Sequence, residues 1–188
     1  MINKNIPRIM GERVFLSLLR TDDEAVCKYL TWMSNETTCV NIEMNGVVVD
    51  ESKMPGWVSD HSVMRMGIVV KESDSLVGYC HIDHRALADA AWLSINIGAE
   101  EARGKGIGFE VMSMLTRYCF DELGVESVHL DVLETNKAAI ACYTKVGFKI
   151  SGTYRKHCIY KGKRYDWHHM DMIREEWEAK NNGQSTNS

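Results

Sequence analysis

The chain has 188 residues, 45% of them hydrophobic, which is enough for the core of one well-packed domain and short for two. A net charge of −4 and an isoelectric point near 6.0 argue against a nucleic-acid-binding protein, because such proteins usually carry a basic field. No apolar run approaches the ~20 residues of a membrane span, and the amino terminus lacks an apolar signal core. We therefore expect a cytoplasmic protein with neither nucleic acid nor membrane as a partner.

The first third of the chain predicts a strand followed by a helix. Val14–Leu19 is short and apolar, as a strand is. Thr21 and Glu24 are the two ends of a capping box, which is typical of a helix start. Apolar residues then recur at helical spacing between Ala25 and Met33. Residues 34–60 carry no pattern that predicts an element.

Two apolar runs and a glycine-rich loop follow. Residues 65–71 and 76–82 are separated by a short polar stretch, which predicts an antiparallel hairpin. Trp92–Ile97 is predicted to be a buried strand, and the loop Arg103–Gly108 leads into a helix that begins near Gly106. Such a loop leaves backbone N–H groups unpaired and aimed at one point, where the positive end of the helix dipole adds to them. The stretch therefore predicts a phosphate site.

The spacing of the glycines excludes two common phosphate-binding loops. A P-loop needs four residues between its first glycine and the Gly-Lys pair, whereas five residues separate Gly98 from Gly104. The dinucleotide-binding fingerprint also fails, because Phe109 stands where its third glycine should be. Two interpretations remain: a phosphate ligand held by another kind of loop, or a tight strand-to-helix turn without a ligand.

The second half of the chain alternates between helices and strands. The helix after the loop is predicted to end at Gly124, and Ser127–Leu133 alternates apolar and polar residues as a strand does. Thr135 or Asn136 then caps a short helix that Gly147 ends. Three more strands are predicted, at residues 148–152, 156–160 and 165–173.

The glycine loop and a second motif resemble the GNAT superfamily of N-acetyltransferases. The loop matches the family pattern R/Q-x-x-G-x-G/A, and the second motif is carried at the expected spacing by Leu130–Asn136, Ala139, Tyr143 and the pair Gly147-Phe148. Within the superfamily, residues 147–167 make the chain similar to the Rim-type (ribosomal-protein acetylating) and spermidine-acetylating groups. The resemblance implies acetyl-CoA as the co-substrate.

The fold that the resemblance implies is α/β (α+β): one GNAT-like domain with a mixed, mostly antiparallel, twisted sheet and helices on both faces. We expect this single domain to cover residues 1–178 and a disordered tail to cover residues 179–188, where no apolar residue follows Ala179. The residues expected to bind the cofactor lie on the strand, in the loop and on the second helix: Ser94, Ile95, Asn96, Ile97, Arg103, Gly104, Lys105, Gly106, Ile107, Gly108, Asn136, Ala139 and Tyr143.

Catalysis requires a proton donor for the departing thiolate and a base for the amine. The resemblance places the phenol of Tyr143 near the thioester sulfur, as the general acid. The base is open, because many Rim-type relatives carry a glutamate where Trp92 stands here. The candidates are Glu134, Asp131, Asp83, His81, His84 and Glu36. We take Tyr143 and Glu134 as the expected catalytic residues, and we expect no metal, because the histidines lack i, i+4 spacing with a carboxylate.

The acceptor is predicted to be a primary amine, either a small molecule such as a polyamine or amino sugar or the amino terminus of a peptide. Residues 1–90 hold 9 Lys and Arg against 13 Asp and Glu, so the whole deficit of −4 falls in the half that would bind the acceptor. This field would attract a cation, although a solvated acidic surface explains the count equally well. The alternative function is an acyl-CoA-binding sensor without catalysis. A homodimer is left open.

Overall fold

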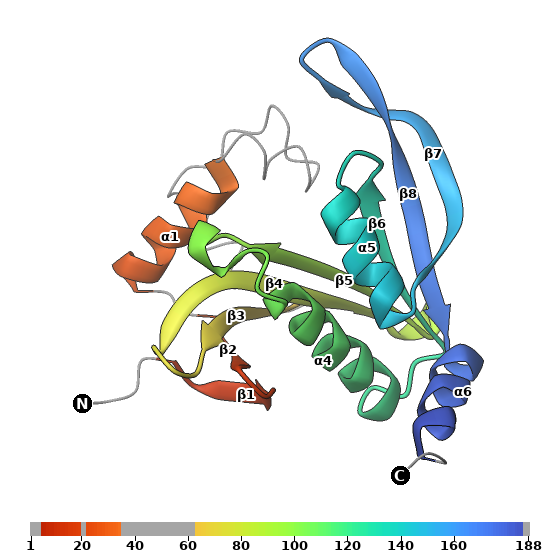
Figure 1. The fold of residues 1–188 in the computed structure, drawn as a ribbon, viewed down its shortest axis with the longest axis horizontal. Helices are drawn as coiled ribbons and strands as arrows, with labels where there is room; N and C mark the ends of the chain where they lie inside the picture. The colour runs from red at the N-terminus through yellow and green to blue at the C-terminus, as the bar shows by residue number, and fades with distance from the viewer. Residues whose placement is uncertain (1–4, 20–21, 35–62, 186–188) are drawn as a thin grey trace.

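The computed structural model describes residues 5–19, 22–34 and 63–185. Within them, one sheet of eight strands has the order β1-β2-β3-β4-β5-β6-β8-β7, and Figure 1 shows it as a twisted surface. Every neighbouring pair is antiparallel except β5 and β6, which are parallel. The prediction of a mixed, mostly antiparallel sheet is thus confirmed. The strands are β1 (Pro7–Met10), β2 (Val14–Leu18), β3 (Met64–Val70), β4 (Ser75–Arg85), β5 (Ala90–Ile97), β6 (Ser127–Leu133), β7 (Lys149–Tyr160) and β8 (Lys163–Ile173).

Helices cover both faces of the sheet, as expected. The helices are α1 (Asp23–Ser34), α4 (Ile107–Asp121), α5 (Lys137–Val146) and α6 (Arg174–Ser185), with short 3-10 turns η2 (Ala86–Ala88) and η3 (Glu100–Ala102). The larger core joins α4 to alternate residues of the central strands, among them Leu16, Cys80 and Leu130. Phe15 and Tyr79 point to the other face, where they pack with α1. None of the described helices is long and apolar enough to cross a membrane.

The hairpin and the two central helices follow the sequence closely. β3 and β4 pair across a turn at residues 71–74, and β4 continues three residues beyond the predicted end. α4 begins directly after Gly106, and α5 is capped by Asn136, whose side chain accepts the Ala139 N–H at 3.2 Å. Gly147 ends α5 with a φ of 126°. These boundaries confirm the predicted start of α4 and both ends of α5, whereas α4 ends at Asp121 with Glu122 as its cap, before the predicted Gly124.

The start of α1 differs from the predicted capping box. Thr21 lies outside the described residues, and the observed cap is Asp22, whose carboxylate accepts the Ala25 N–H at 3.3 Å. A carboxylate at this position also interacts favourably with the positive end of the helix dipole. The strand β1, which no sequence pattern predicted, pairs with β2 at the edge of the sheet.

The strands expected at residues 148–152 and 156–160 are one strand, β7. Between them Tyr154 stays paired with Trp167, and the register then shifts before Cys158. Lys156 takes a φ of 54° in this irregular stretch, and its N–H donates to the Asp166 carboxylate at 2.8 Å. The strand accommodates the extra residues as a bulge and does not end there.

The tail expected to be disordered from Ala179 is helical as far as Ser185, so that prediction is wrong for residues 179–185. The helix α6 is anchored at its start, because the Trp177 ring stacks on Phe120 with centroids 5.4 Å apart. Farther along, the Lys180 ammonium donates to the backbone carbonyl of Val146. These contacts lie outside the helix itself, and low hydrophobicity after Ala179 therefore gave the wrong prediction.

Candidate functional site

The site forms where β5 and β6 separate. The two parallel strands pair only from Ala90 to Trp92 on β5 and from Ser127 to His129 on β6. Beyond these residues β5 continues to Ile97 and β6 to Leu133 without further pairing between them. The backbone of β5 beyond Trp92 therefore faces β6 with groups that a ligand can bind. We call this place the fork.

A cleft of about 600 Å³ lies at the fork, between the end of β5, the glycine loop and α5. Its size is in the range of small-molecule sites. It collects ten of the thirteen residues expected to bind a cofactor: Ile95, Asn96, Ile97, Arg103, Gly104, Gly106, Gly108, Asn136, Ala139 and Tyr143. Sequence motifs from two separate stretches thus meet at one cavity.

The glycine loop is shaped for close approach of an anion. Gly104 and Gly106 take φ values of 70° and 79°, which residues with a Cβ rarely adopt. Nothing lies within 4 Å of where a Gly104 side chain would begin, so the loop surface there is open. Because Gly106 caps α4 without a side chain, the first N–H groups of the helix are left for a ligand.

The side chain of Arg103 holds the loop against the strand. Its Nε donates to the Ile97 carbonyl at 2.8 Å, and its Nη2 donates to the Gly98 carbonyl at 3.2 Å. These bonds satisfy carbonyl groups at the end of β5, which turns there into η3. Arg103 also lines the cleft, so its guanidinium connects the glycine loop to the end of β5 within the site.

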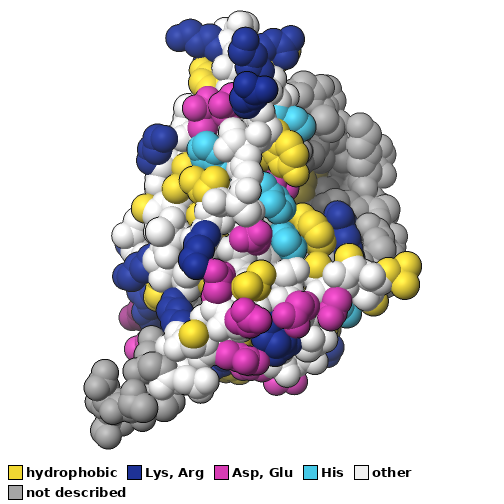
Figure 2. All heavy atoms as spheres, turned by 90° about the vertical axis from the view of Figure 1, so that its right-hand side faces the viewer, with side chains coloured by type: hydrophobic (Ala, Val, Ile, Leu, Met, Phe, Trp, Pro, Cys, Tyr) yellow, Lys and Arg dark blue, Asp and Glu magenta, His cyan; other side chains and the backbone are white. Residues whose placement is uncertain are grey.

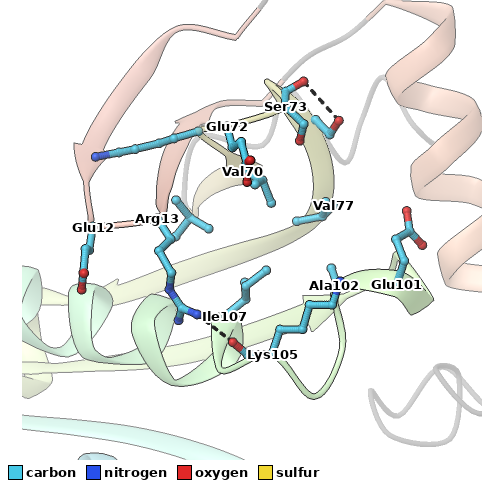
Figure 3. Close-up of a pocket in the computed structure, with 13 residues that line it drawn as sticks. Glu12, Arg13, Val70, Glu72, Ser73, Val77, Glu101, Ala102, Lys105 and Ile107 are labelled. Carbon is cyan, nitrogen blue, oxygen red and sulfur yellow. Dashed lines mark hydrogen bonds between the residues drawn. The ribbon is translucent and has the colours of Figure 1, made fainter.

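Residues near the amino terminus also hold the glycine loop and the start of α4 in place. The Glu110 carboxylate accepts the backbone N–H groups of Arg13 and Val14, at 2.7 and 3.2 Å, and the Arg13 Nε at 2.9 Å. Arg13 also donates through Nη1 to the Lys105 carbonyl at 2.7 Å, inside the loop (Figure 3). Partial burial raises the pKa of Glu110, but the three hydrogen bonds and the charge of Arg13 outweigh it and leave the pKa below its usual value.

Lys105 and Ile107 face another cavity. It has a volume of about 710 Å³ and lies between the residues before β2, the turn from β3 to β4 and the outer side of the glycine loop (Figure 3). Its rim mixes charges of both signs, among them Arg13, Glu72 and Lys105. Ile107 is buried. These two residues, like Ser94, do not line the cleft at the fork.

The phenol of Tyr143 lines the cleft from α5. Its ring meets Phe148 edge-on, with centroids 6.4 Å apart. Burial raises the pKa of Tyr143 well above its usual value, and the neighbouring Cys142 adds to this, so the hydroxyl keeps its proton at physiological pH. A protonated phenol in the cleft can donate a hydrogen bond or a proton to a bound group.

Several cleft residues were not predicted. Phe109 follows the loop, and Lys145 stands two residues after Tyr143 on α5, with its ammonium 4.6 Å from the centre of the Phe109 ring. The other unpredicted lining residues are Ala102, Asp131, Val132, Ala138, Ala141 and Cys142, of which Asp131 was only a candidate base.

The candidate bases lie in different places. Glu134 is not among the residues that line the cleft, and its carboxylate accepts the Asp166 N–H at 2.8 Å. Asp83 pairs with Arg85 at 3.0 Å, and His84 is exposed. Glu36 lies outside the described residues. Asp131 lines the cleft.

His81 occupies a half-buried position on β4, opposite Ser94 of β5. Burial lowers the pKa of His81 to about 4, with a further lowering from Arg65 that Asp83 partly opposes. Its imidazole is therefore neutral at physiological pH.

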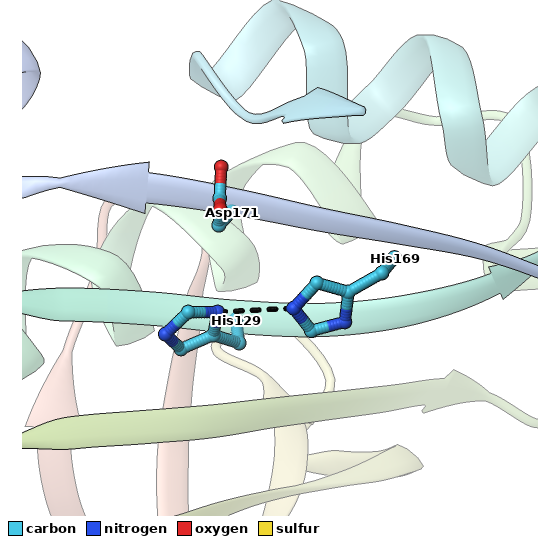
Figure 4. A group of neighbouring side chains, drawn as sticks. All are labelled: His129, His169 and Asp171. Carbon is cyan, nitrogen blue, oxygen red and sulfur yellow. Dashed lines mark hydrogen bonds between the residues drawn. The ribbon is translucent and has the colours of Figure 1, made fainter. Parts of the chain in front are cut away.

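A group of histidines and carboxylates lies where the fork begins. His129, His169 and Asp171 bring atoms that could hold a metal ion within 4.8 Å of one another (Figure 4). The His129 Nδ1 and His169 Nε2 atoms are 3.1 Å apart and hydrogen-bonded. An i, i+4 pattern in the sequence does not reveal this group, because its residues come from the neighbouring strands β6 and β8, at registers that only the sheet sets.

A family model described as an acetyltransferase (GNAT) domain matches residues 13–149 of the chain. This stretch includes both sequence motifs and all the described elements from β2 to α5.

Among characterised and uncharacterised relatives, the chain is 38% identical over 79 residues to the SPbeta prophage-derived uncharacterized N-acetyltransferase YokL of Bacillus subtilis, which covers 42% of this chain and 45% of that protein. It is 29% identical over 72 residues to the L-amino acid N-acetyltransferase AaaT of Escherichia coli, covering 38% and 44%. The chain thus spans less than half the length of these curated relatives.

The fold is shared with solved structures along almost the whole chain. A spermidine N-acetyltransferase from Vibrio cholerae in complex with CoA and spermine superposes with a TM-score of 0.76 at 17% identity, covering 88% of this chain and 98% of that one. A GNAT-family acetyltransferase from Bacillus anthracis gives a TM-score of 0.75 at 15% identity, covering 89% and 98%. At such identities the likeness concerns the fold alone.

Proposed function

The chain belongs to the GNAT family of acetyltransferases, and from this premise we propose that it transfers an acetyl group from acetyl-CoA directly to a primary amine. The observation that carries the proposal is the cleft at the fork, where the glycine loop, the end of β5 and α5 meet. Each of these three elements offers groups that would bind one part of acetyl-CoA.

The diphosphate of acetyl-CoA would lie against the glycine loop. The N–H groups at the start of α4 and the positive end of the helix dipole favour a doubly charged anion there. The ammonium of Lys145 stands in the same cleft and adds a positive charge. The pantetheine arm would follow the unpaired edge of β5 from Ile97 toward Trp92, where backbone groups are left without a strand partner on the β6 side.

Tyr143 would protonate the departing thiolate. The amine nitrogen attacks the thioester carbon, the carbon–sulfur bond breaks and the sulfur leaves with the electron pair. The raised pKa of Tyr143 keeps the phenol protonated, so its hydroxyl holds the proton that the sulfur needs, and burial in the same cleft would also raise the basicity of the departing thiolate. Backbone N–H groups on the free edge of β5 would stabilise the charge on the tetrahedral oxygen.

The acceptor that we favour is a small cationic amine of the polyamine class. Support comes from the acidic first half of the chain and from the fold likeness to a spermidine N-acetyltransferase of Vibrio cholerae. An amino sugar and a peptide amino terminus are the other acceptors within reach of this chemistry. A homodimer and a cytoplasmic location stay predictions.

Two measurements test the function. Thiol release from acetyl-CoA is followed with polyamines, amino sugars, aminoglycosides and peptides that begin with Ala or Ser. We expect turnover with a polyamine and a Michaelis constant for it that rises with salt. Tight binding of acetyl-CoA without turnover on any amine would contradict catalysis and favour the sensor.

Binding of acetyl-CoA is tested with Gly106→Val. The new side chain would have to adopt a φ of 79° and would meet Arg13, so the N–H groups of the loop should turn away from the phosphates. We expect affinity for acetyl-CoA, measured by calorimetry, to fall by roughly 10- to 100-fold. The matched control is Gly124→Val, which has a φ of 70° at the other end of α4 and open space around it. Equal affinities for acetyl-CoA in the two variants would contradict a phosphate site at the glycine loop.

A further inference from the structure

Four side chains at the fork form one continuous chain of hydrogen bonds. His169 Nδ1 lies 2.7 Å from the Asp131 carboxylate, and His169 Nε2 lies 3.1 Å from His129 Nδ1. His129 Nε2 lies 2.8 Å from the Ser127 hydroxyl. Both imidazoles therefore use both of their nitrogens. We call Asp131, His169, His129 and Ser127 the histidine chain.

The partners at the two ends fix where the protons are. An ionised Asp131 can only accept, so His169 must carry its proton on Nδ1. His169 Nε2 is then an acceptor, so His129 must carry its proton on Nδ1 and accept the Ser127 hydroxyl at Nε2. One arrangement of neutral imidazoles thus satisfies every contact. A metal ion would need the two facing nitrogens to turn their lone pairs toward it, and one of them carries the proton of this bond.

The surroundings hold His129 neutral and in place. Its ring stacks on Trp92 with centroids 4.4 Å apart, and the Arg85 guanidinium lies 4.1 Å from the centre of the Trp92 ring. Burial lowers the pKa of His129, His169 and Arg85 lower it further, and the carboxylates of Asp171 and Asp131 oppose them in part. Tyr154 meets His169 edge-on, with centroids 6.3 Å apart.

Asp131 lies on β6 beside the cleft, and its side chain points to the face of the sheet opposite α4. Val132 and Leu130 of β6 belong to the core under α4, so the alternation of the strand turns Asp131 to the other face. Asp131 is nevertheless among the residues that line the cleft, because β5 no longer pairs with β6 at this level. Its side chain is 35% exposed. Figure 2 shows histidine side chains at the surface of this side of the molecule, below the basic tip of the β7–β8 hairpin.

The position of Asp131 suits an amine that approaches from the side opposite to the cofactor. α4, α5 and the glycine loop enclose the cleft on one side, so a thioester bound there is open toward the face on which Asp131 lies. Of the described residues that line the cleft, Asp131 alone carries a carboxylate. Since His169 holds one of its oxygens, the second oxygen is turned to a fixed direction.

We propose that Asp131 is the catalytic base of the acetyl transfer and that His169 and His129 are positioning residues that hold its carboxylate. This inference rests on the proposed function. When the amine has attacked the thioester carbon, one N–H proton of the new C–N bond passes to the free oxygen of Asp131. The carbon–sulfur bond breaks, the sulfur takes a proton from Tyr143, and the proton on Asp131 returns through water to the tyrosine. The products are the amide and free CoA, and no proton is gained or lost.

The arrangement of protons can be read without any turnover. Nitrogen-15 spectra of the imidazoles at pH 7.5 should show His169 and His129 both protonated on Nδ1 and bare on Nε2. Asp131→Asn should disturb the signals of His169 and then of His129, because the first acceptor of the chain is altered. A His169 that carries its proton on Nε2 in the unaltered protein would overturn the inference.

The catalytic role is read from kinetics. Asp131→Asn should lower kcat by roughly 100-fold or more while the dissociation constant for acetyl-CoA changes by less than about 2-fold. The control is Glu122→Gln, an exposed carboxylate at the end of α4, which should leave kcat unchanged. Glu134→Gln tests the rival carboxylate, which already accepts the Asp166 N–H. Loss of kcat in Glu134→Gln with full activity in Asp131→Asn would assign the base to Glu134 instead.

The positioning role is read from a conservative pair. His169→Asn offers an amide N–H close to where Nδ1 stands and should keep kcat within about 5-fold, whereas His169→Leu removes the donor and should cost roughly 10-fold or more. The matched control is His168→Leu, whose ring is the next along β8 and bonds to Thr153 at 3.0 Å. Equal losses in His169→Asn and His169→Leu would show that the donor is not what matters.

The two proposals fail in different ways. An unaltered protein that binds acetyl-CoA and acetylates no amine contradicts the proposed function. An unaltered protein that acetylates an amine, with Asp131→Asn equally active, leaves that function standing and removes Asp131 as the base.

Discussion

The two walls of the fork are built by different means. The wall of the glycine loop comes from short contiguous stretches, and its shape depends on backbone conformation, N–H groups and helix caps. The wall of the histidine chain comes from side chains on β6 and β8, which are 40 residues apart at His129 and His169. A phosphate-binding wall can be seen in a short motif, whereas a wall of paired side chains exists only when the sheet has formed.

The largest effect on stability is expected at Glu110, because this residue next to the glycine loop depends on a contact that is distant in the sequence. Glu110 reaches 97 residues back to Arg13, and its side chain is only 12% exposed. Glu110→Gln removes the charge that accepts two backbone N–H groups and the guanidinium, and we expect the free energy of unfolding to fall by about 2–3 kcal/mol. Urea unfolding followed by circular dichroism measures it.

The same variant should weaken acetyl-CoA binding several-fold, because Arg13 also holds the Lys105 carbonyl in the loop. Glu122→Gln, an exposed residue at the other end of α4, is the matched control and should change neither quantity. If Glu110→Gln unfolds at the same urea concentration as the unaltered protein, the contact between Glu110 and Arg13 does not stabilise the fold, and the glycine loop is held by residues near it in the sequence.

An effect of about 2–3 kcal/mol on the free energy of unfolding that depends on pH is expected at His81 on β4. The pKa of His81 is lowered to about 4, so the folded protein resists a proton that the unfolded chain accepts near the ordinary value of ~6.5. This part of the stability is complete above pH ~6.5 and is lost as the pH falls toward 4. His81→Gln should remove that loss.

The measurement compares the free energy of unfolding at pH 7 and at pH 4.5 for the unaltered protein, His81→Gln and the control His84→Gln, whose histidine is exposed on the same strand. A fall that is just as steep in His81→Gln would mean that His81 is already protonated in the folded protein, against its contact with Arg65.

The smallest effect sharpens the comparison, because it concerns a local feature. Asn136→Ala removes the cap of α5 and should lower the free energy of unfolding by about 1 kcal/mol. Asn136→Asp, which keeps an acceptor for the Ala139 N–H, should restore most of it. Thermal unfolding of the pair decides the point, and an unchanged melting temperature in Asn136→Ala would show that the rest of α5 holds its start without the cap.

Local patterns gave correct predictions at three helix ends, where a residue acts on its own neighbours. Asn136 caps α5 and Gly147 ends it, and Gly106 opens α4, because these effects depend on backbone groups within a few residues. Prediction failed where distant contacts decide. Trp177 on Phe120 anchors a helix that composition did not indicate, and the pairing of Tyr154 with Trp167 keeps β7 continuous.

The candidate site divides in the same way. The sequence by itself determined the glycine loop, the end of β5 and the position of Tyr143, since each belongs to a motif whose spacing is set along the chain. Only the tertiary structure placed Asp131 in the cleft and Glu134 outside its lining, turned Lys105 and Ile107 toward another cavity, and joined His129 to His169. The physical reason is that a side chain's partner across a sheet is set by register and by the point where two strands separate, and neither quantity is written in any short stretch of sequence.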